Sequence, residues 1–271
     1  MTMTPTWPAA LTVAGSDSGG GAGIQADLRT FAFHLVHGTS ALTCVTAQNT
    51  VGVMRVDALP PEAVVAQIEA VTSDIAVQAV KTGMLLNQEI IQAVALALKA
   101  LPDTTPVVVD PVMVSRTGAQ LIDDDAIATL TRHLIPQARV LTPNRYEAQL
   151  LSGLAITTLA DMEAAARQIY QLGPQAVLVK GGGMMDALRS TDVWFDGSEV
   201  VILEAEVVET KHTHGTGCTL SAAIAANLAL GKDPLTAVKD AKNYVTNALK
   251  HALAIGKGQG PVGHFFPLIS Q

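Results

Sequence analysis

The sequence is poor in cysteine and in basic residues. Of 271 residues, only Cys44 and Cys218 are cysteines, which excludes a disulfide scaffold and favours the reducing cytoplasm. Lysine and arginine number 17 against 24 aspartates and glutamates, for a formal net charge of −7. This balance, without any basic run, argues against nucleic acid or an anionic membrane as the main partner. A small solute is the remaining class of partner.

The sequence also lacks a clear membrane segment. Residues 213–231 carry no Asp, Glu, Lys or Arg, but they are rich in Ala, Gly, Ser, Thr and Asn. We therefore expect a core helix there and no membrane partner. Residues 1–5 show neither the basic nor the apolar region of a secretory leader.

Apolar strands alternate with amphipathic helices along the chain. The pattern predicts strands at 11–14, 41–46, 77–81, 106–110, 138–142 and 176–180, and helices at 61–73, 87–101, 123–134, 158–172 and 234–254. This order is typical of an α/β fold with a central, mostly parallel sheet and helices on both faces. Residues 194–200 predict a small peripheral β-hairpin around an Asp-Gly turn. Without repeats or linkers, one domain spanning residues 1–271 is expected.

Two glycine-rich stretches stand where strands meet helices. His214-Gly215-Thr216-Gly217-Cys218-Thr219 opens the apolar helix, so its backbone N–H groups and the helix dipole can hold a phosphoryl group. An ordinary helix start with a small buried cysteine is the alternative. Residues 14–28, after the apolar strand, form the second stretch. Because no Walker lysine follows and the GxGxxG spacing is absent, the P-loop and Rossmann interpretations fail.

Several motifs occur together and in a fixed order. They are AGSDSGGGAGIQAD (14–27), AQNT (47–50), KTGM (81–84), DPVM (110–113), TPN with Glu147 (142–147), VKGG (179–182) and HGTGC (214–218). In this set the chain resembles the ribokinase-like superfamily, and within it the hydroxymethylpyrimidine/phosphomethylpyrimidine kinases of thiamine biosynthesis. The resemblance runs from Leu11 to Val262. It implies a ribokinase-like fold, ATP and Mg²⁺ as cofactors, a small pyrimidine substrate and a homodimer.

The nucleotide side of the site is expected where predicted strands end, since ligands of such sheets bind at the carboxyl edge. Asp110 follows a buried strand and is compatible with a magnesium-linked role or with a helix-capping turn. Asn144 and Glu147 form an Asn-x-x-Glu capping pattern, and the resemblance adds a role for this pair in organising magnesium and phosphates. Lys180 lies between an apolar strand and three glycines. By resemblance it lies on the ATP side.

The resemblance gives further residues to both ligands. Thr213, Gly215 and Gly217 join Asn144 and Lys180 on the ATP side. Gln48 offers a donor and an acceptor side by side, as an aminopyrimidine requires. By resemblance, Gly15, Asp27, Met84 and Val112 complete the pyrimidine pocket, although Asp27 also fits a solvated helix residue.

Cys218 occupies the position at which many ribokinase-like kinases carry an aspartate as general base. We expect the helix N-terminus to favour its thiolate, which would accept the alcohol proton; a small apolar filler is the alternative. Lys81 follows a strand and is expected to be exposed.

The sequence thus predicts a kinase that phosphorylates 4-amino-5-hydroxymethyl-2-methylpyrimidine and then its monophosphate. The catalytic residues would be Lys180, Gly215, Gly217 and Cys218, with Asp110 and Glu147 holding the metal, partly through water. A pyridoxine or pyridoxal kinase is the nearest alternative. More remote ones are a hydrolase with Cys218 as nucleophile beside His214, and a non-catalytic vitamin sensor.

Overall fold

A computed structural model describes residues 7–114 and 120–269. Residues 1–5, for which the sequence predicts no secretory leader, lie outside the described residues. The described strands form one sheet in the order β3-β2-β1-β4-β5-β6-β7-β8-β9. From β2 to β7 the neighbours are parallel, whereas β3, β8 and β9 pair antiparallel. The strands are β1 (Ala9–Asp17), β2 (His37–Gln48), β3 (Val53–Ala58), β4 (Ala79–Thr82), β5 (Val107–Val109), β6 (Val140–Leu141), β7 (Val177–Val179), β8 (Thr191–Phe195) and β9 (Val200–Glu204).

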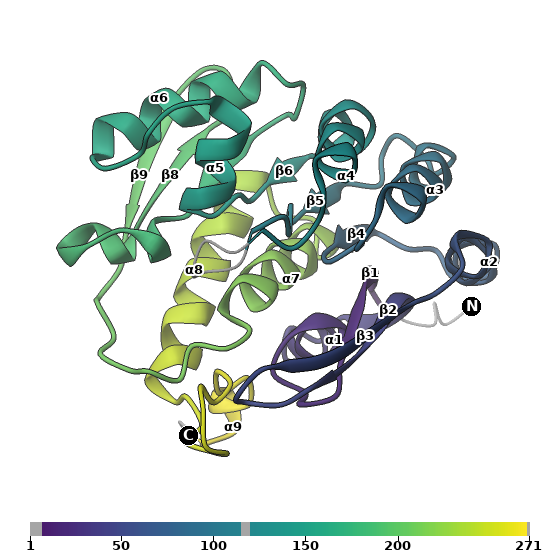
Figure 1. Ribbon diagram of the computed structural model, residues 1–271, viewed down its shortest axis with the longest axis horizontal. Helices are drawn as coiled ribbons and strands as arrows, with labels where there is room; N and C mark the ends of the chain where they lie inside the picture. The colour runs from purple at the N-terminus through teal and green to yellow at the C-terminus, as the bar shows by residue number, and fades with distance from the viewer. Residues whose placement is uncertain (1–6, 115–119, 270–271) are drawn as a thin grey trace, which may run out of the picture.

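Helices cover both faces of this sheet (Figure 1). One face packs against α2 (Pro61–Thr72), α3 (Gln88–Lys99), α4 (Asp124–Thr129), α5 (Arg145–Ser152) and α6 (Leu159–Tyr170). The other face packs against α1 (Gly23–Phe33), α7 (Thr216–Ala229) and α8 (Pro234–Lys250), and the short α9 (Phe266–Ile269) follows. The predicted α/β architecture is confirmed.

Strand residues alternate between the two cores. Val107 and Val109 pack on the side of α3, and Val108 packs on the side of α7. All three side chains are buried, which explains why this strand is a continuous apolar run rather than an alternating one. The central strands are therefore anchored by buried side chains on both faces of the sheet. Polar residues follow where these strands end.

Most predicted elements are present, with three differences. Residues 123–134 form α4 only as far as Thr129 and continue as a π-helical turn, Leu130–Leu134. The strand β3 was not predicted, because its side chains are exposed and show no core-facing alternation. The helix α5 was foreseen only as a capping pattern.

The hairpin and the core helix agree with the sequence predictions. Phe195 pairs with Val200 across the turn that holds Gly197, whose φ is +93°. The helix α7 is buried from Thr219 to Ala229 in the interior of the fold. In the part of the chain that the structure describes, no helix has the length and apolar character needed to cross a membrane.

Candidate active site

A cavity of about 470 Å³ lies at the carboxyl edge of the sheet, beside the start of α7. It brings together most of the predicted site residues: Asp110, Val112, Asn144, Glu147, Lys180, Thr213, Gly215, Gly217 and Cys218. The remaining four, Gly15, Asp27, Gln48 and Met84, lie outside its lining. The nucleotide-side and catalytic residues of the prediction thus share one cavity with Val112, whereas the other four pyrimidine-side residues lie outside its lining.

An ion pair between Lys180 and Asp110 forms the charged wall of this cavity. The Lys180 Nζ lies 3.1 Å from Asp110 Oδ1, and Ser221 Oγ donates to Asp110 Oδ2 at 3.1 Å. Burial alone would lower the pKa of Lys180, but the carboxylates of Asp110 and Glu147 raise it above its usual value. Lys180 is therefore a permanent cation in the cavity wall.

Ser221 was missed by the sequence analysis, although a signal for it exists. It lies four residues after Gly217, so one helical turn places both on the same face of α7. A polar residue at that spacing inside an apolar helix needs a buried partner, and here the hydroxyl lies 3.1 Å from Asp110 Oδ2 and equally far from the carbonyl oxygens of Gly217 and Cys218.

Asn144 and Glu147 form the capping box that the sequence predicts. The Asn144 Oδ1 accepts hydrogen bonds from the N–H groups of Tyr146 and Glu147 at 2.9 and 3.1 Å. In return Glu147 Oε2 accepts from the Asn144 N–H at 2.7 Å, and Oε1 accepts from Met113 N–H at 3.2 Å. The cap holds the Glu147 carboxylate in the cavity wall, so capping and lining coexist.

The environment of Glu147 opposes its negative charge. Burial, the largest cause, and the nearby Asp110 raise its pKa to about 8, although Lys180 and the N–H groups of Asn144 and Met113 lower it. Two buried carboxyl groups thus lie beside a single ammonium group, and Glu147 keeps its proton at neutral pH. A cation bound between the two carboxyl groups would favour the ionised form of Glu147.

The start of α7 is shaped by two glycines with different surroundings. Gly215 is the N-cap with φ +82°, and a Cβ there would lie 1.8 Å from the Gly21 carbonyl oxygen. A Cβ on Gly217 would lie 3.5 Å from Lys180 Nζ and 3.8 Å from Asp110 Oδ2. Among the described residues no side chain caps α7, so its first turn presents N–H groups beside the Lys180 cation.

Cys218 does not have the charge state that we expected from its position. Burial raises the pKa of its thiol to about 11, although Lys81 and the Gly23 N–H lower it. The expectation of a thiolate is therefore wrong for this structure, because desolvation outweighs the helix start and the lysine.

A second buried ion pair lies near Cys218, between Lys81 and Asp27. The Lys81 Nζ is 2.8 Å from Asp27 Oδ2, which also accepts from Thr12 Oγ1 at 2.6 Å. Both charged side chains are fully buried, so the expectation of an exposed Lys81 and the alternative of a solvated Asp27 are wrong. Burial raises the pKa of Asp27, and Lys81 lowers it.

Gly15 and Met84 lie next to each other on the pyrimidine side of the prediction. A Cβ on Gly15 would lie 3.1 Å from Met84 Cε and 2.7 Å from Cys44 Sγ, so only glycine fits between these side chains.

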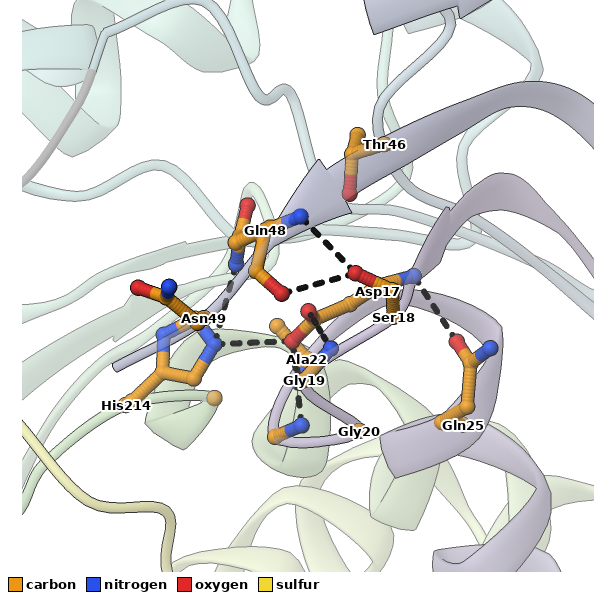
Figure 2. Close-up of polar contacts among 12 residues, drawn as sticks. Asp17, Ser18, Gly19, Gly20, Ala22, Gln25, Thr46, Gln48, Asn49 and His214 are labelled. Carbon is orange, nitrogen blue, oxygen red and sulfur yellow. Dashed lines mark hydrogen bonds and ion pairs between the residues drawn. The ribbon is translucent and has the colours of Figure 1, made fainter. Parts of the chain in front are cut away.

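Gln48, at the end of β2, belongs to a polar network with Asp17 and His214 (Figure 2). The His214 Nε2 lies 2.8 Å from Asp17 Oδ2 and 3.1 Å from Gln48 Nε2. Because the ring nitrogen is directed to these two groups, the pairing of His214 with Cys218 that a hydrolase requires is not formed. Asp17 was not singled out from the sequence, since 197 positions separate it from His214.

Known proteins resemble this chain over almost its whole length. A family model described as phosphomethylpyrimidine kinase matches residues 17–263. The hydroxymethylpyrimidine/phosphomethylpyrimidine kinase of Synechococcus elongatus is 64% identical over 261 residues, which cover 96% of this chain and 98% of that protein.

Two solved structures share the fold. The phosphomethylpyrimidine kinase of Clostridium difficile is 42% identical with a TM-score of 0.80, covering 89% of this chain and 99% of that one. The pyridoxal kinase of Staphylococcus aureus, in complex with AMP-PCP and pyridoxal, is 36% identical with a TM-score of 0.88, covering 96% and 94%. Fold and site define a ribokinase-like, ATP-using kinase. The chain belongs to the phosphomethylpyrimidine kinase family.

Proposed function

We propose that the cavity beside α7 is where this chain transfers a phosphoryl group from ATP to a pyrimidine. The reaction is the ATP-dependent phosphorylation of 4-amino-5-hydroxymethyl-2-methylpyrimidine to its monophosphate and then to its diphosphate, in thiamine biosynthesis. One observation carries the site assignment. The uncapped first turn of α7 lies directly beside the Lys180–Asp110 pair in the lining of the same cavity, so N–H donors and a buried cation occur together at one place.

We assign the ATP phosphates to Lys180, Gly215 and Gly217, with Asn144 and Thr213 completing the nucleotide side. In phosphoryl transfer the charge is spread over the three equatorial oxygens of the transferred group, the attacking and leaving oxygens lie roughly in line, and catalysis comes mainly from positioning and electrostatics. Lys180 and the Gly217 N–H, which are neighbours in the cavity wall, would supply this stabilisation together. Neither has to move, because both are held by the sheet and by α7.

Magnesium fits the two buried carboxylates. Within the described residues no group of three or more His, Cys, Asp or Glu side chains encloses a metal site, so the protein alone does not form a cage. Mg²⁺ is commonly held by one or two carboxylates together with phosphates and water. Asp110 and Glu147 would hold it in this way, and the ion would neutralise charge on the phosphates. Glu147→Gln should raise the magnesium concentration that gives half-maximal activity.

The pyrimidine is assigned to Gln48, Asp27, Gly15, Met84 and Val112. Gln48 would pair with the amino group and its neighbouring ring nitrogen, and Met84 and Val112 would contact the ring faces. Asp27 acts here as the partner of Lys81, which keeps a positive charge close to Cys218. The alcohol proton would pass to Cys218 in the small fraction of molecules with the thiolate.

We further propose a single domain, a homodimer and a cytoplasmic location. The edge strand β3 exposes Val53, Met54 and Val56 by 54%, 75% and 41%, an apolar edge that suits a second copy. Both cysteines are free, as a reducing compartment requires.

The substrate assignment is tested by comparing two rings. With ATP and magnesium saturating, kcat/KM for the hydroxymethylpyrimidine should exceed that for pyridoxal, a relative's ligand that also carries a hydroxymethyl group. A higher kcat/KM for pyridoxal would instead assign the chain to vitamin B6 phosphorylation. If ATP were consumed with neither the hydroxymethylpyrimidine nor pyridoxal, the chain would instead be a non-catalytic vitamin sensor.

A further inference from the structure

The ends of β1 and β2 and the segment before α7 are joined by three side chains, Asp17, Gln48 and His214 (Figure 2). Asp17 is the last residue of β1, Gln48 is the last residue of β2, and His214 directly precedes the N-cap Gly215. One atom, His214 Nε2, meets both of the others, at 2.8 Å from Asp17 Oδ2 and 3.1 Å from Gln48 Nε2. The network therefore links the pyrimidine side of the site to the phosphate side.

Asp17 fixes which group donates in this network. Its Oδ1 accepts from the Gly19 N–H at 2.8 Å, and its Oδ2 accepts from the N–H groups of Gly21 and Ala22 at 3.0 and 2.8 Å. Burial raises the pKa of Asp17, but His214 and the backbone donors outweigh it and hold that pKa below its usual value. An ionised carboxylate only accepts, so His214 Nε2 carries a proton and donates it to Asp17.

This proton in turn sets the orientation of the Gln48 amide. A protonated ring nitrogen cannot accept from the Gln48 NH₂ group, and two donors facing each other at 3.1 Å are unfavourable. Turning the amide over places Oε1 beside the His214 N–H, which Asp17 Oδ2 and Gln48 Oε1 then share as acceptors, and removes the conflict. The NH₂ group and the second lone pair of Oε1 then point away from His214, as a donor and an acceptor for a ligand.

The position of the His214 ring is fixed by close packing. A Cβ on Gly21 would lie 2.3 Å from His214 Cδ2, so the ring rests directly on the backbone of the glycine-rich loop. The backbone of His214 is held as well, since its N–H donates to Gly260 and its carbonyl accepts from Val262, both at 3.2 Å. A shift of this segment would move the Gln48 contact and the N-cap of α7 together.

We propose that Asp17 and His214 are positioning residues, which fix the orientation of the Gln48 amide for the aminopyrimidine and couple it to the phosphate-binding start of α7. This inference rests on the proposed function. In this arrangement Gln48 contacts the ligand, His214 orients the Gln48 amide without having to contact the ligand, and Asp17 acts through His214.

A double-mutant cycle tests the inference. The dissociation constant of 4-amino-5-hydroxymethyl-2-methylpyrimidine is measured by calorimetry without ATP for the wild type, Gln48→Ala, His214→Ala and the double variant. Each single change should weaken binding by about tenfold, and the double variant should be no weaker than Gln48→Ala. The KM for ATP should stay within about twofold of the wild type in Gln48→Ala, which leaves the segment before α7 unchanged.

Two further variants keep the test decisive. His214→Gln retains an N–H donor within reach of Oε1 and should recover most of the binding. His212→Ala is the matched control, since His212 Nδ1 accepts from the Gly260 N–H at 3.0 Å in the same segment. It should leave pyrimidine binding within about twofold of the wild type.

Additive losses, with the double variant about 100-fold weaker than the wild type, would overturn the inference because His214 would then act independently of Gln48. An equal loss in His212→Ala would overturn it as well. A wild-type protein that binds no pyrimidine would instead refute the proposed function itself.

Discussion

At Cys218, burial and electrostatics act in opposite directions. Desolvation raises the pKa of the thiol to about 11, whereas the Lys81 ammonium and the Gly23 N–H stabilise the thiolate. At pH 7 about one molecule in 10⁴ carries the thiolate, by the ordinary titration relation. Below pH 11 the fraction of molecules with the thiolate falls tenfold for each pH unit. If Cys218 is the base, the rate should therefore rise with pH.

The alcohol step should therefore depend on pH through Cys218. With chemistry limiting, kcat for the hydroxymethylpyrimidine should rise about tenfold per unit between pH 7 and 9, since deprotonation of the thiol supplies the base. The monophosphate is already largely ionised near neutral pH, with a second pKa of about 6, so kcat of the second step should change less. Cys218→Ala should lower the alcohol rate more than the monophosphate rate and flatten its slope. An unchanged slope in Cys218→Ala would show that this thiol only packs.

In our proposal Lys180 contacts the ATP phosphates, which both transfers use. Lys180→Ala should lower kcat about 100-fold or more with either acceptor, because the same triphosphate loses a buried cation. Rates with the alcohol and the monophosphate are compared at saturating ATP. Lys232→Ala is the control, since its ion pair with Asp240 is well exposed and lies outside the cavity lining. Wild-type rates in Lys180→Ala would remove this residue from the phosphate site.

The helix α7 is the element that joins the fold to the chemistry. Its middle is buried against the sheet, and its first turn opens into the cavity. The turn after β7 is held to β8 and to α8, which packs against α7, by a buried pair: Lys242 Nζ lies 2.7 Å from Asp192 Oδ2, and Asp192 Oδ1 accepts from the Gly181 N–H at 2.9 Å. Asp192 thus fixes the residue that follows Lys180.

The two glycines of α7 should respond differently to alanine. Gly215→Ala forces a methyl group against the Gly21 carbonyl at a positive φ, and should lower the free energy of unfolding by about 2 kcal/mol or more. Gly217→Ala meets only ordinary contacts within a helix, so stability should be kept or slightly raised. Its methyl group faces the Lys180–Asp110 pair, however, and should raise the KM for ATP. Urea unfolding and steady-state kinetics separate the two effects, and equal stability losses would contradict them.

At the scale of the whole molecule, the sequence predicts the architecture better than the charge states. The apolar strands ending near Asp110, Asn144 and Lys180 were predicted because burial on both faces leaves a continuous apolar run. The burial of Lys81 in β4 and the high pKa of Cys218 in α7 were not predicted. Both depend on which elements pack around these side chains in the folded protein. Sequence spacing also gives no signal for the Asp17–His214 pair, which only the tertiary fold brings together.

The folded state as a whole should lose stability in acid through His264. This side chain is 2% exposed, and burial lowers its pKa to about 4, with Arg29 lowering it further. Between its usual pKa of about 6.5 and about 4, only the unfolded chain takes up the proton, so stability falls as pH falls. This one group contributes at most about 1.4 kcal/mol per pH unit in that window.

Urea unfolding of the wild type and His264→Gln between pH 7 and 4.5 measures this contribution. The difference in free energy of unfolding between the two proteins should change steadily across the window, in favour of the variant at low pH. His133→Gln, at an exposed position, is the control and should follow the wild type. Parallel curves for His264→Gln and the wild type would show that this histidine does not titrate on unfolding.

In our proposal, the site beside α7 catalyses both phosphorylations of the hydroxymethylpyrimidine. The most direct measurement is mass spectrometry of the products over time, after incubation of the purified protein with ATP, magnesium and 4-amino-5-hydroxymethyl-2-methylpyrimidine. We expect the monophosphate to appear first and the diphosphate to follow, with both absent in Lys180→Ala on the same time scale. Product that stops at the monophosphate, or a pyrimidine that stays unchanged, would contradict the proposed function.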